Sequence, residues 1–146
     1  MRSRIVSAAA IAVTVMLAGA AAADGPNGGH RLEADLTGAA ERPGPGDNDG
    51  YGKATVNPQP SKNRICYTLK VVNIDTAIAA HIHEGGVNVA GPVRVTLAAP
   101  SKGESSGCVT VTEILARDIK KNPQDYYVNV HNIDCPRGAV RGQLSK

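Results

Sequence analysis

Turn-forming residues interrupt this chain about every ten residues from Arg31 onward. The 16 Gly and 9 Pro concentrate in runs such as 43–50, 57–63 and 100–107. Segments bounded in this way are long enough for β-strands and too short for a helical bundle. The spacing therefore predicts an antiparallel sandwich or barrel. With no Trp and no Phe, its core must be built mainly from aliphatic side chains.

Only the segment from Glu113 to Asn122 reads as a helix, because Thr112 can cap its start and Pro123 stops it. We expect an all-β, antiparallel, Greek-key-like β-sandwich or barrel of about eight short strands with this one short helix. The expected strands are Arg31–Leu36, Tyr51–Asn57, Arg64–Asn73, Ile78–Glu84, Pro92–Ala98, Gly107–Thr112, Asp125–Asn132 and Gly138–Leu144.

The N-terminus has the three parts of a secretory signal peptide. Arg2 and Arg4 precede an uncharged apolar run, and small residues follow it up to Ala23. We predict a signal peptide over residues 1–23, a flexible leader over 24–30 and one β domain over 31–146. The apolar run is shorter than the roughly 20 residues that span a bilayer. The mature protein is therefore expected to be secreted, with no membrane span after cleavage.

Charge excludes one class of partner. The whole chain has 16 basic and 13 acidic residues, and removal of Arg2 and Arg4 leaves 14 against 13. That balance is too even for a nucleic-acid footprint, so we expect no nucleic-acid partner.

Export also determines how the three cysteines are interpreted, because the exterior permits disulfides. Cys66 and Cys108 both fall in the polar phase of a predicted strand, which suits a bond on the outer face of a sheet. We predict a Cys66–Cys108 disulfide. Cys135 lies in a turn and is left as a free thiol or an intermolecular link.

Histidines are the candidate metal ligands. His81 and His83 flank Ile82 on one strand, so both rings project to the same side. His131 belongs to the polar phase of another strand, and we expect it to join them. Three imidazoles suit copper or zinc and leave a coordination position open. We expect affinity to fall as the pH drops through about 6.5, because the metal needs neutral rings. The alternative is a set of hydrogen-bonded structural histidines.

Two further polar residues are predicted as structural anchors. Arg141 alternates with Val140 and should leave the core and face polar surroundings with Gln143. There it either anchors a carboxylate or a carbonyl near the histidine face, the role we favour, or is simply solvated. Asn129 shares the polar phase of His131, and either Asn129 or Glu84 can orient a histidine ring.

Five blocks, in order, resemble the CHRD domain first described in chordin and also present in bacterial secreted proteins. They are Thr37-Gly38, His81–Gly85, Gly91–Val93, Tyr126–His131 and Gly138–Leu144. The resemblance spans about Arg31 to Leu144. It implies an all-β extracellular module, and it implies no established enzyme activity.

His81-Ile82-His83-Glu84 is also similar to the His-Val-His-Glu strand of copper/zinc superoxide dismutases. There the two histidines would correspond to copper ligands. A site with four histidines would also need His30, from the leader. Two functions therefore stay open: an extracellular binding or structural module with an unidentified partner, and a copper protein with dismutase-like redox activity. The binding-module function predicts no catalysis and no obligatory cofactor. Bound copper or zinc is compatible with both functions.

Overall fold

A computed structural model describes residues 31–146. The predicted signal peptide, the predicted leader and His30 lie outside these residues. The eight strands are β1 (Leu32–Thr37), β2 (Tyr51–Gln59), β3 (Arg64–Val72), β4 (Ala79–Glu84), β5 (Val93–Leu97), β6 (Glu104–Thr110), β7 (Tyr126–His131) and β8 (Val140–Gln143). The helix α1 covers Glu113–Lys121, and single 3-10 turns lie at Gly38–Ala40, Pro60–Lys62 and Pro123–Asp125.

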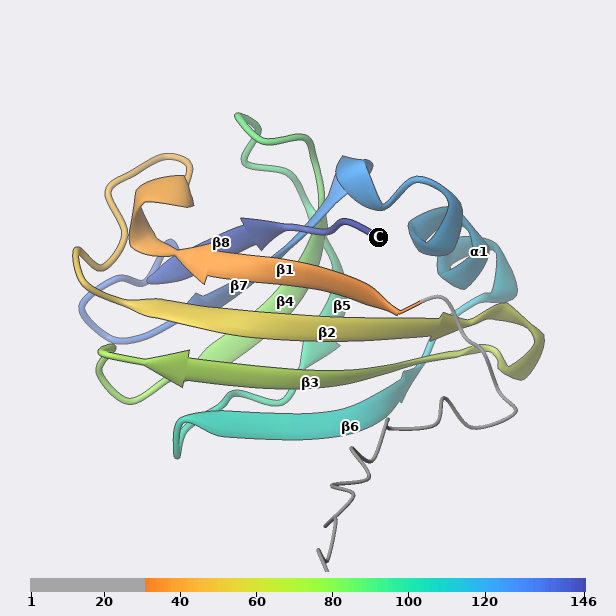
Figure 1. Cartoon of the computed structure of the whole chain (residues 1–146), viewed down its shortest axis with the longest axis horizontal. Helices are drawn as coiled ribbons and strands as arrows, with labels where there is room; N and C mark the ends of the chain where they lie inside the picture. Colours follow the sequence, from red (N-terminus) through yellow and green to blue (C-terminus); the bar gives the residue numbers. More distant parts are fainter. Residues whose placement is uncertain (1–30) are drawn as a thin grey trace, which may run out of the picture.

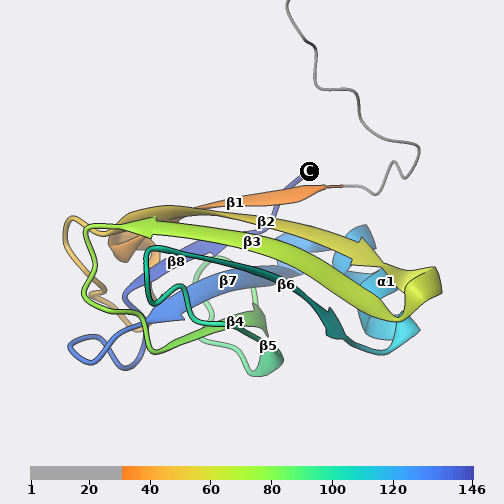
Figure 2. The ribbon, with the colours of Figure 1, turned by 90° about the horizontal axis from the view of Figure 1, so that it is seen from below.

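All eight strands form one antiparallel sheet in the order β5-β4-β7-β8-β1-β2-β3-β6. The sheet curls until its edge strands β5 and β6 approach each other (Figures 1 and 2). Ser105 Oγ of β6 donates to Ala98 O, directly after β5, at 2.7 Å. Ala98 N donates to Tyr67 Oη of β3, the neighbour of β6, at 2.8 Å. The fold is thus a nearly closed barrel, one of the two predicted architectures.

Period-two alternation builds the core. In β1, Leu32, Ala34 and Leu36 point inward and are buried, while the residues between them are exposed. The same pattern buries Ile65, Tyr67, Leu69 and Val71 of β3, Ile82 of β4, and Val128 and Val130 of β7. The core is aliphatic, with Tyr67 and Tyr126 as its large aromatic members. This agrees with a sequence that has no Trp and no Phe.

The predicted helix is present and lies at one end of the barrel (Figure 1). Thr112 Oγ1 accepts from Leu115 N at 3.2 Å, and Pro123 lies just beyond the last turn. Ala116 and Ile119 are the buried face of α1. In the described part of the chain no helix is both long enough and apolar enough to cross a bilayer.

Most strand boundaries differ from the prediction by one to three residues, and two of these differences have a clear physical reason. The predicted loop at 100–107 ends earlier than expected, at Gly103, because β6 begins at Glu104, which pairs with Lys70 of β3. The second strand runs on to Gln59 and includes Pro58. Proline is tolerated there because pairing with β1 stops at Val56, so Pro58 needs no partner for the missing N–H.

Cys66 and Cys108 are direct partners on β3 and β6 and form a disulfide. Cys66 is half-buried and Cys108 is exposed, so the bond lies on the outer face of the sheet. It fastens β6, which is an edge strand, to the neighbour that holds it. Cys135 is free and half-buried, in the turn before β8. Burial and the nearby carboxylates of Asp47 and Asp134 raise the pKa of its thiol.

Replacing Cys66 and Cys108 with alanine should lower the free energy of unfolding by about 4 kcal/mol, from the chain entropy of a loop closed over 42 residues. Urea denaturation of the mature protein measures the change. The matched control is Cys135→Ala, which removes a thiol and should shift stability far less. Equal losses for the two variants would contradict the assignment of the stabilising bond.

Candidate metal centre

Strand pairing gathers the three histidines on one face of the sheet. In the β4–β7 register His81 lies opposite Asn129, Ala79 opposite His131 and His83 opposite Tyr127. Partners in register point to the same side of a sheet. The polar phase of β4 and the polar phase of β7 therefore form one continuous surface on the outside of the barrel.

The rings converge on a single point. Ring centroids are 5.0 Å apart for His81 and His131, 5.5 Å for His81 and His83, and 6.5 Å for His83 and His131. One nitrogen from each ring lies within 4.8 Å of the other two. Among the His, Cys, Asp and Glu side chains of residues 31–146, these three form the group that is close enough together to hold a metal ion.

Hydrogen bonds to the backbone fix which nitrogens carry protons. His83 Nδ1 lies 2.8 Å from Gly91 O, and His131 Nδ1 lies 3.1 Å from Pro136 O. A carbonyl only accepts, so both Nδ1 atoms donate and both Nε2 atoms keep a bare lone pair. His83 Nε2 is buried with no hydrogen-bond partner, and His131 Nε2 lies 3.1 Å from His81 Nδ1. With no metal bound, His81 Nδ1 therefore donates to His131 Nε2. A metal would replace this hydrogen bond, with His81 in its other tautomer, and would then meet one nitrogen lone pair from each ring.

All three rings are held neutral. Burial, followed by the neighbouring rings of His131 and His83, lowers the pKa of His81 to about 4. Burial is also the main cause of the lowered pKa values of His83 and His131. Protons therefore compete with a metal only below the ordinary histidine pKa of about 6.5. The expected loss of affinity moves to lower pH than the sequence alone indicated.

Asn129 is 2 % exposed and lies between the histidines. Its Oδ1 is placed 3.1 Å from His131 Nε2. A neutral His131 ring that donates from Nδ1 to Pro136 O cannot also donate from Nε2. The contact with Asn129 is therefore satisfied when the Asn129 amide is rotated so that its NH2 group donates to His131 Nε2. In either orientation the amide holds the His131 ring from one side, while Pro136 O holds it from the other.

Arg141 lies in the predicted polar phase and is 1 % exposed, which fits the anchoring role considered for it and not a solvated side chain. Its Cζ lies 3.4 Å from the centre of the Tyr127 ring, and its Nη2 donates to Gly86 O at 2.8 Å. Tyr127 in turn stacks on His83 with centroids 4.8 Å apart and planes at 8°. The guanidinium thus anchors a carbonyl and supports the ring stack behind His83.

The segment between β4 and β5 buries this polar face. Gly91 N donates to Tyr127 Oη at 3.1 Å, and Gln143 Nε2 donates to Gly85 O at 2.8 Å. At Gly91 a Cβ would come within 1.6 Å of Glu84 O, so only glycine fits. Sequence reasoning missed Gly91, Tyr127 and the carbonyl of Pro136. Of these, only Tyr127 left a signal, because it shares the phase of Asn129 and His131.

Glu41 is a second buried ionisable group whose charge interacts with Arg141. Burial raises the pKa of Glu41 to about 7, and the positive charge of Arg141 limits that rise. The carboxyl is therefore partly protonated at neutral pH.

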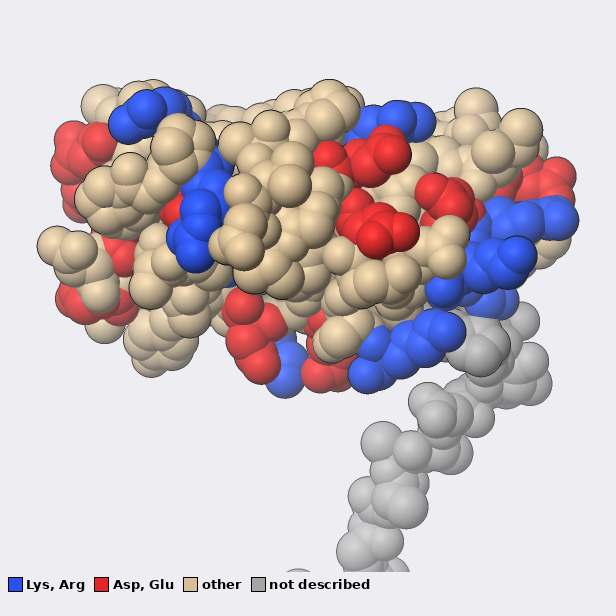
Figure 3. All heavy atoms as spheres, turned by 90° about the horizontal axis from the view of Figure 1, so that it is seen from above, with Lys and Arg blue, Asp and Glu red and all other residues tan. Residues whose placement is uncertain are grey.

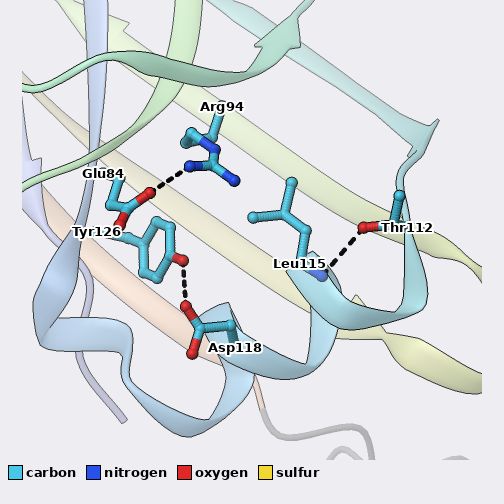
Figure 4. Close-up of polar contacts among 6 residues, drawn as sticks. All are labelled: Glu84, Arg94, Thr112, Leu115, Asp118 and Tyr126. Atoms are coloured by element: carbon cyan, nitrogen blue, oxygen red, sulfur yellow. Dashed lines mark hydrogen bonds and ion pairs between the residues drawn. The ribbon is translucent and has the colours of Figure 1, made fainter.

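Glu84 does not orient a histidine ring, contrary to the alternative drawn from the sequence. It belongs to the opposite phase of β4 and pairs with Arg94 at 2.5 Å (Figure 4). This pair lines a hollow beside α1, where Tyr126 donates a hydrogen bond to Asp118. In Figure 4 Glu84 is bonded to Arg94 and Asp118 to Tyr126, and no hydrogen bond or ion pair links these groups to the histidines.

A sequence profile described as the CHRD domain matches residues 32–144. The chain belongs to the CHRD family. No curated protein and no solved structure matches it. In this CHRD domain, four of the five blocks that carry the resemblance supply the site: β4, the covering segment, β7 and β8.

The stability of the metal-free protein should depend on pH in the way expected for histidines that are neutral in the folded state. Their pKa values are lowered in the folded state, so the unfolded chain takes up protons first as the pH falls below about 6.5. Their contribution to stability is complete above pH 6.5 and is lost as the pH falls toward 4. Each neutral ring contributes at most about 1.4 kcal/mol per pH unit in that window.

Urea denaturation in EDTA at pH 7 and pH 5 measures this effect. Glu41 titrates in the opposite sense, because its raised pKa favours the folded state as the pH falls. The comparison is therefore made with the triple variant His81→Gln, His83→Gln, His131→Gln, which keeps Glu41. A pH dependence equal in both proteins would show that the histidines are not held neutral.

Arg141→Ala should lower the free energy of unfolding by about 2–4 kcal/mol, because it leaves the Gly86 carbonyl unbonded and a void against Tyr127. Arg141→Lys should restore little, since an ammonium lacks the planar surface that stacks on the ring. Thermal denaturation checks both variants. The matched control is Arg137→Ala, an exposed arginine three residues before β8; a loss as large there would contradict the anchor role.

Proposed function

We propose that this protein is an exported CHRD module that acts by binding, and that His81, His83 and His131 form a transition-metal site within it. One observation carries the proposal: a nitrogen from each of three rings lies within 4.8 Å of the other two. Metal–nitrogen bonds of 2.0–2.1 Å need ligand nitrogens about 3–3.5 Å apart, so small ring movements complete the site.

Copper(II) is the metal we expect to bind most tightly. Imidazole ligands suit both copper and zinc, and copper leads in the general order of affinity. The ligands need no proton loss at neutral pH, because burial keeps their pKa values low. Three protein ligands leave a coordination position open, and His81 and His131 are only half-buried.

Export is supported by two sequence features and one contact. Residues 1–23 have the order of a signal peptide, and the resemblance to CHRD modules implies an extracellular setting. The Cys66–Cys108 bond suits an oxidising compartment. We place the mature protein outside the cell on these grounds.

Dismutase-like redox activity is the second candidate function. The partial exposure of His81 favours it, because a small oxidant needs access to a metal position. Burial of His83, Asn129 and Arg141 under the β4–β5 segment favours a binding or structural role. We therefore rank binding first.

Titration of EDTA-treated mature protein with copper(II) should give one tightly bound equivalent, measured by metal analysis after dialysis. Its electron paramagnetic resonance spectrum should show nitrogen ligands. The variant His81→Ala, His83→Ala, His131→Ala should bind at least about 100-fold more weakly. The matched control, His30→Ala, removes the remaining histidine of the mature chain and should keep the site.

Three outcomes bear on these proposals. Copper binding that survives in the triple variant would leave the binding module without its metal site. Loss of copper in His30→Ala would show a different ligand set. Rapid consumption of superoxide by the copper-loaded protein, absent in the triple variant, would favour the redox candidate over a purely binding role.

A further inference from the structure

A basic groove of about 660 Å³ lies between α1 and the β2–β3 connection. Pockets that hold small ligands or parts of polymers span about 300–1,000 Å³. Lys and Arg side chains gather at this end of the molecule (Figure 3). The lining consists of Pro60, Ser61, Glu113, Arg117, Lys120, Lys121 and Lys146. Four cationic side chains thus face one acidic side chain, that of Glu113.

The single carboxylate is already occupied. Glu113 pairs with Arg117 four residues later on α1. Within residues 31–146 no carboxylate lies within 4.0 Å of Lys120, Lys121 or Lys146. The three ammonium groups therefore keep their charge available for a ligand.

The dipole of α1 explains the position of only some of the lysines that line the groove. Lysines in a last turn complement the negative end of the helix dipole, which accounts for Lys120 and Lys121. Lys146 follows β8 and belongs to no helix, yet it lines the same groove. The mature chain has 14 basic and 13 acidic residues, so the concentration of positive charge here is local.

We propose that this groove binds an acidic polysaccharide. Lysines are flexible point charges that suit the repeated anionic groups of a polymer better than one planar anion. The lining contains no aromatic side chain on which nucleic-acid bases would stack. Its one apolar residue, Pro60, offers little surface for insertion into a membrane. The choice of ligand rests on the extracellular role proposed above and is independent of the metal site.

Binding of the mature protein to dextran sulfate tests the proposal, with uncharged dextran as the matched polymer and EDTA present throughout. The variant Lys120→Gln, Lys121→Gln should bind the sulfated polymer about tenfold more weakly, with a shallower dependence on salt. The control variant Lys53→Gln, Lys70→Gln removes the same charge from the outer face of β2 and β3 and should bind as the parent does. Thermal denaturation confirms that each variant is folded, and Lys146→Gln repeats the test outside the helix.

Four results would overturn the proposal: equal binding to uncharged dextran, equal loss in the control variant, no loss in the variants of the groove, or tighter binding to single-stranded DNA or to phosphatidylglycerol vesicles than to the sulfated polymer. The triple histidine variant separates the two proposals. It should lose copper and keep the polysaccharide, so failure of either site leaves the other unaffected.

Discussion

Pairing of β4 with β7 is the interaction on which the site depends. The register is fixed from the other side of the sheet, where Ile82 and Val128 are partners and both are fully buried. A slip of one residue would carry the histidines into the core and the apolar side chains out of it. The energetic cost of that exchange is what keeps His81 near a ring that lies 50 residues away in sequence.

Burial of the polar face is the second feature that shapes the site. Arg141, Asn129 and His83 all lie on the outside of the barrel and yet are almost inaccessible to solvent. Desolvation of such groups is unfavourable unless they are bonded, and the β4–β5 segment supplies much of that bonding through carbonyls. Gly91 O of this segment also sets the tautomer of His83, and Pro136 O, in the turn after β7, sets that of His131. A cover made of backbone therefore determines which ring nitrogens are left to bind a metal.

The alternation of apolar and polar residues, together with the turn-forming residues, predicted most of the fold. The β1 and β3 patterns, the Thr112 cap and the Pro123 stop are local signals, and the structure contains the elements they predicted. Residues 104–107 were misjudged as loop because Ser and Gly signal turns, whereas pairing with β3 holds them extended. Alternation gave the face that Arg141 takes, but not its almost complete burial, because burial depends on the segment that covers that face. Glu84 was considered as an aid to the histidines, but it faces Arg94 on the other side of β4.

The sequence by itself determined the strands, their two faces, and the fact that His81 and His83 share one of them, because these follow from a backbone period of two. It also determined that Cys66 and Cys108 take the same phase. Only the tertiary structure decided that His131 joins the other rings, that a glycine-rich segment covers them, and that lysines from α1 and from the residues after β8 line one groove. Strand order and loop placement depend on contacts between residues far apart in the chain, and no local pattern encodes those contacts.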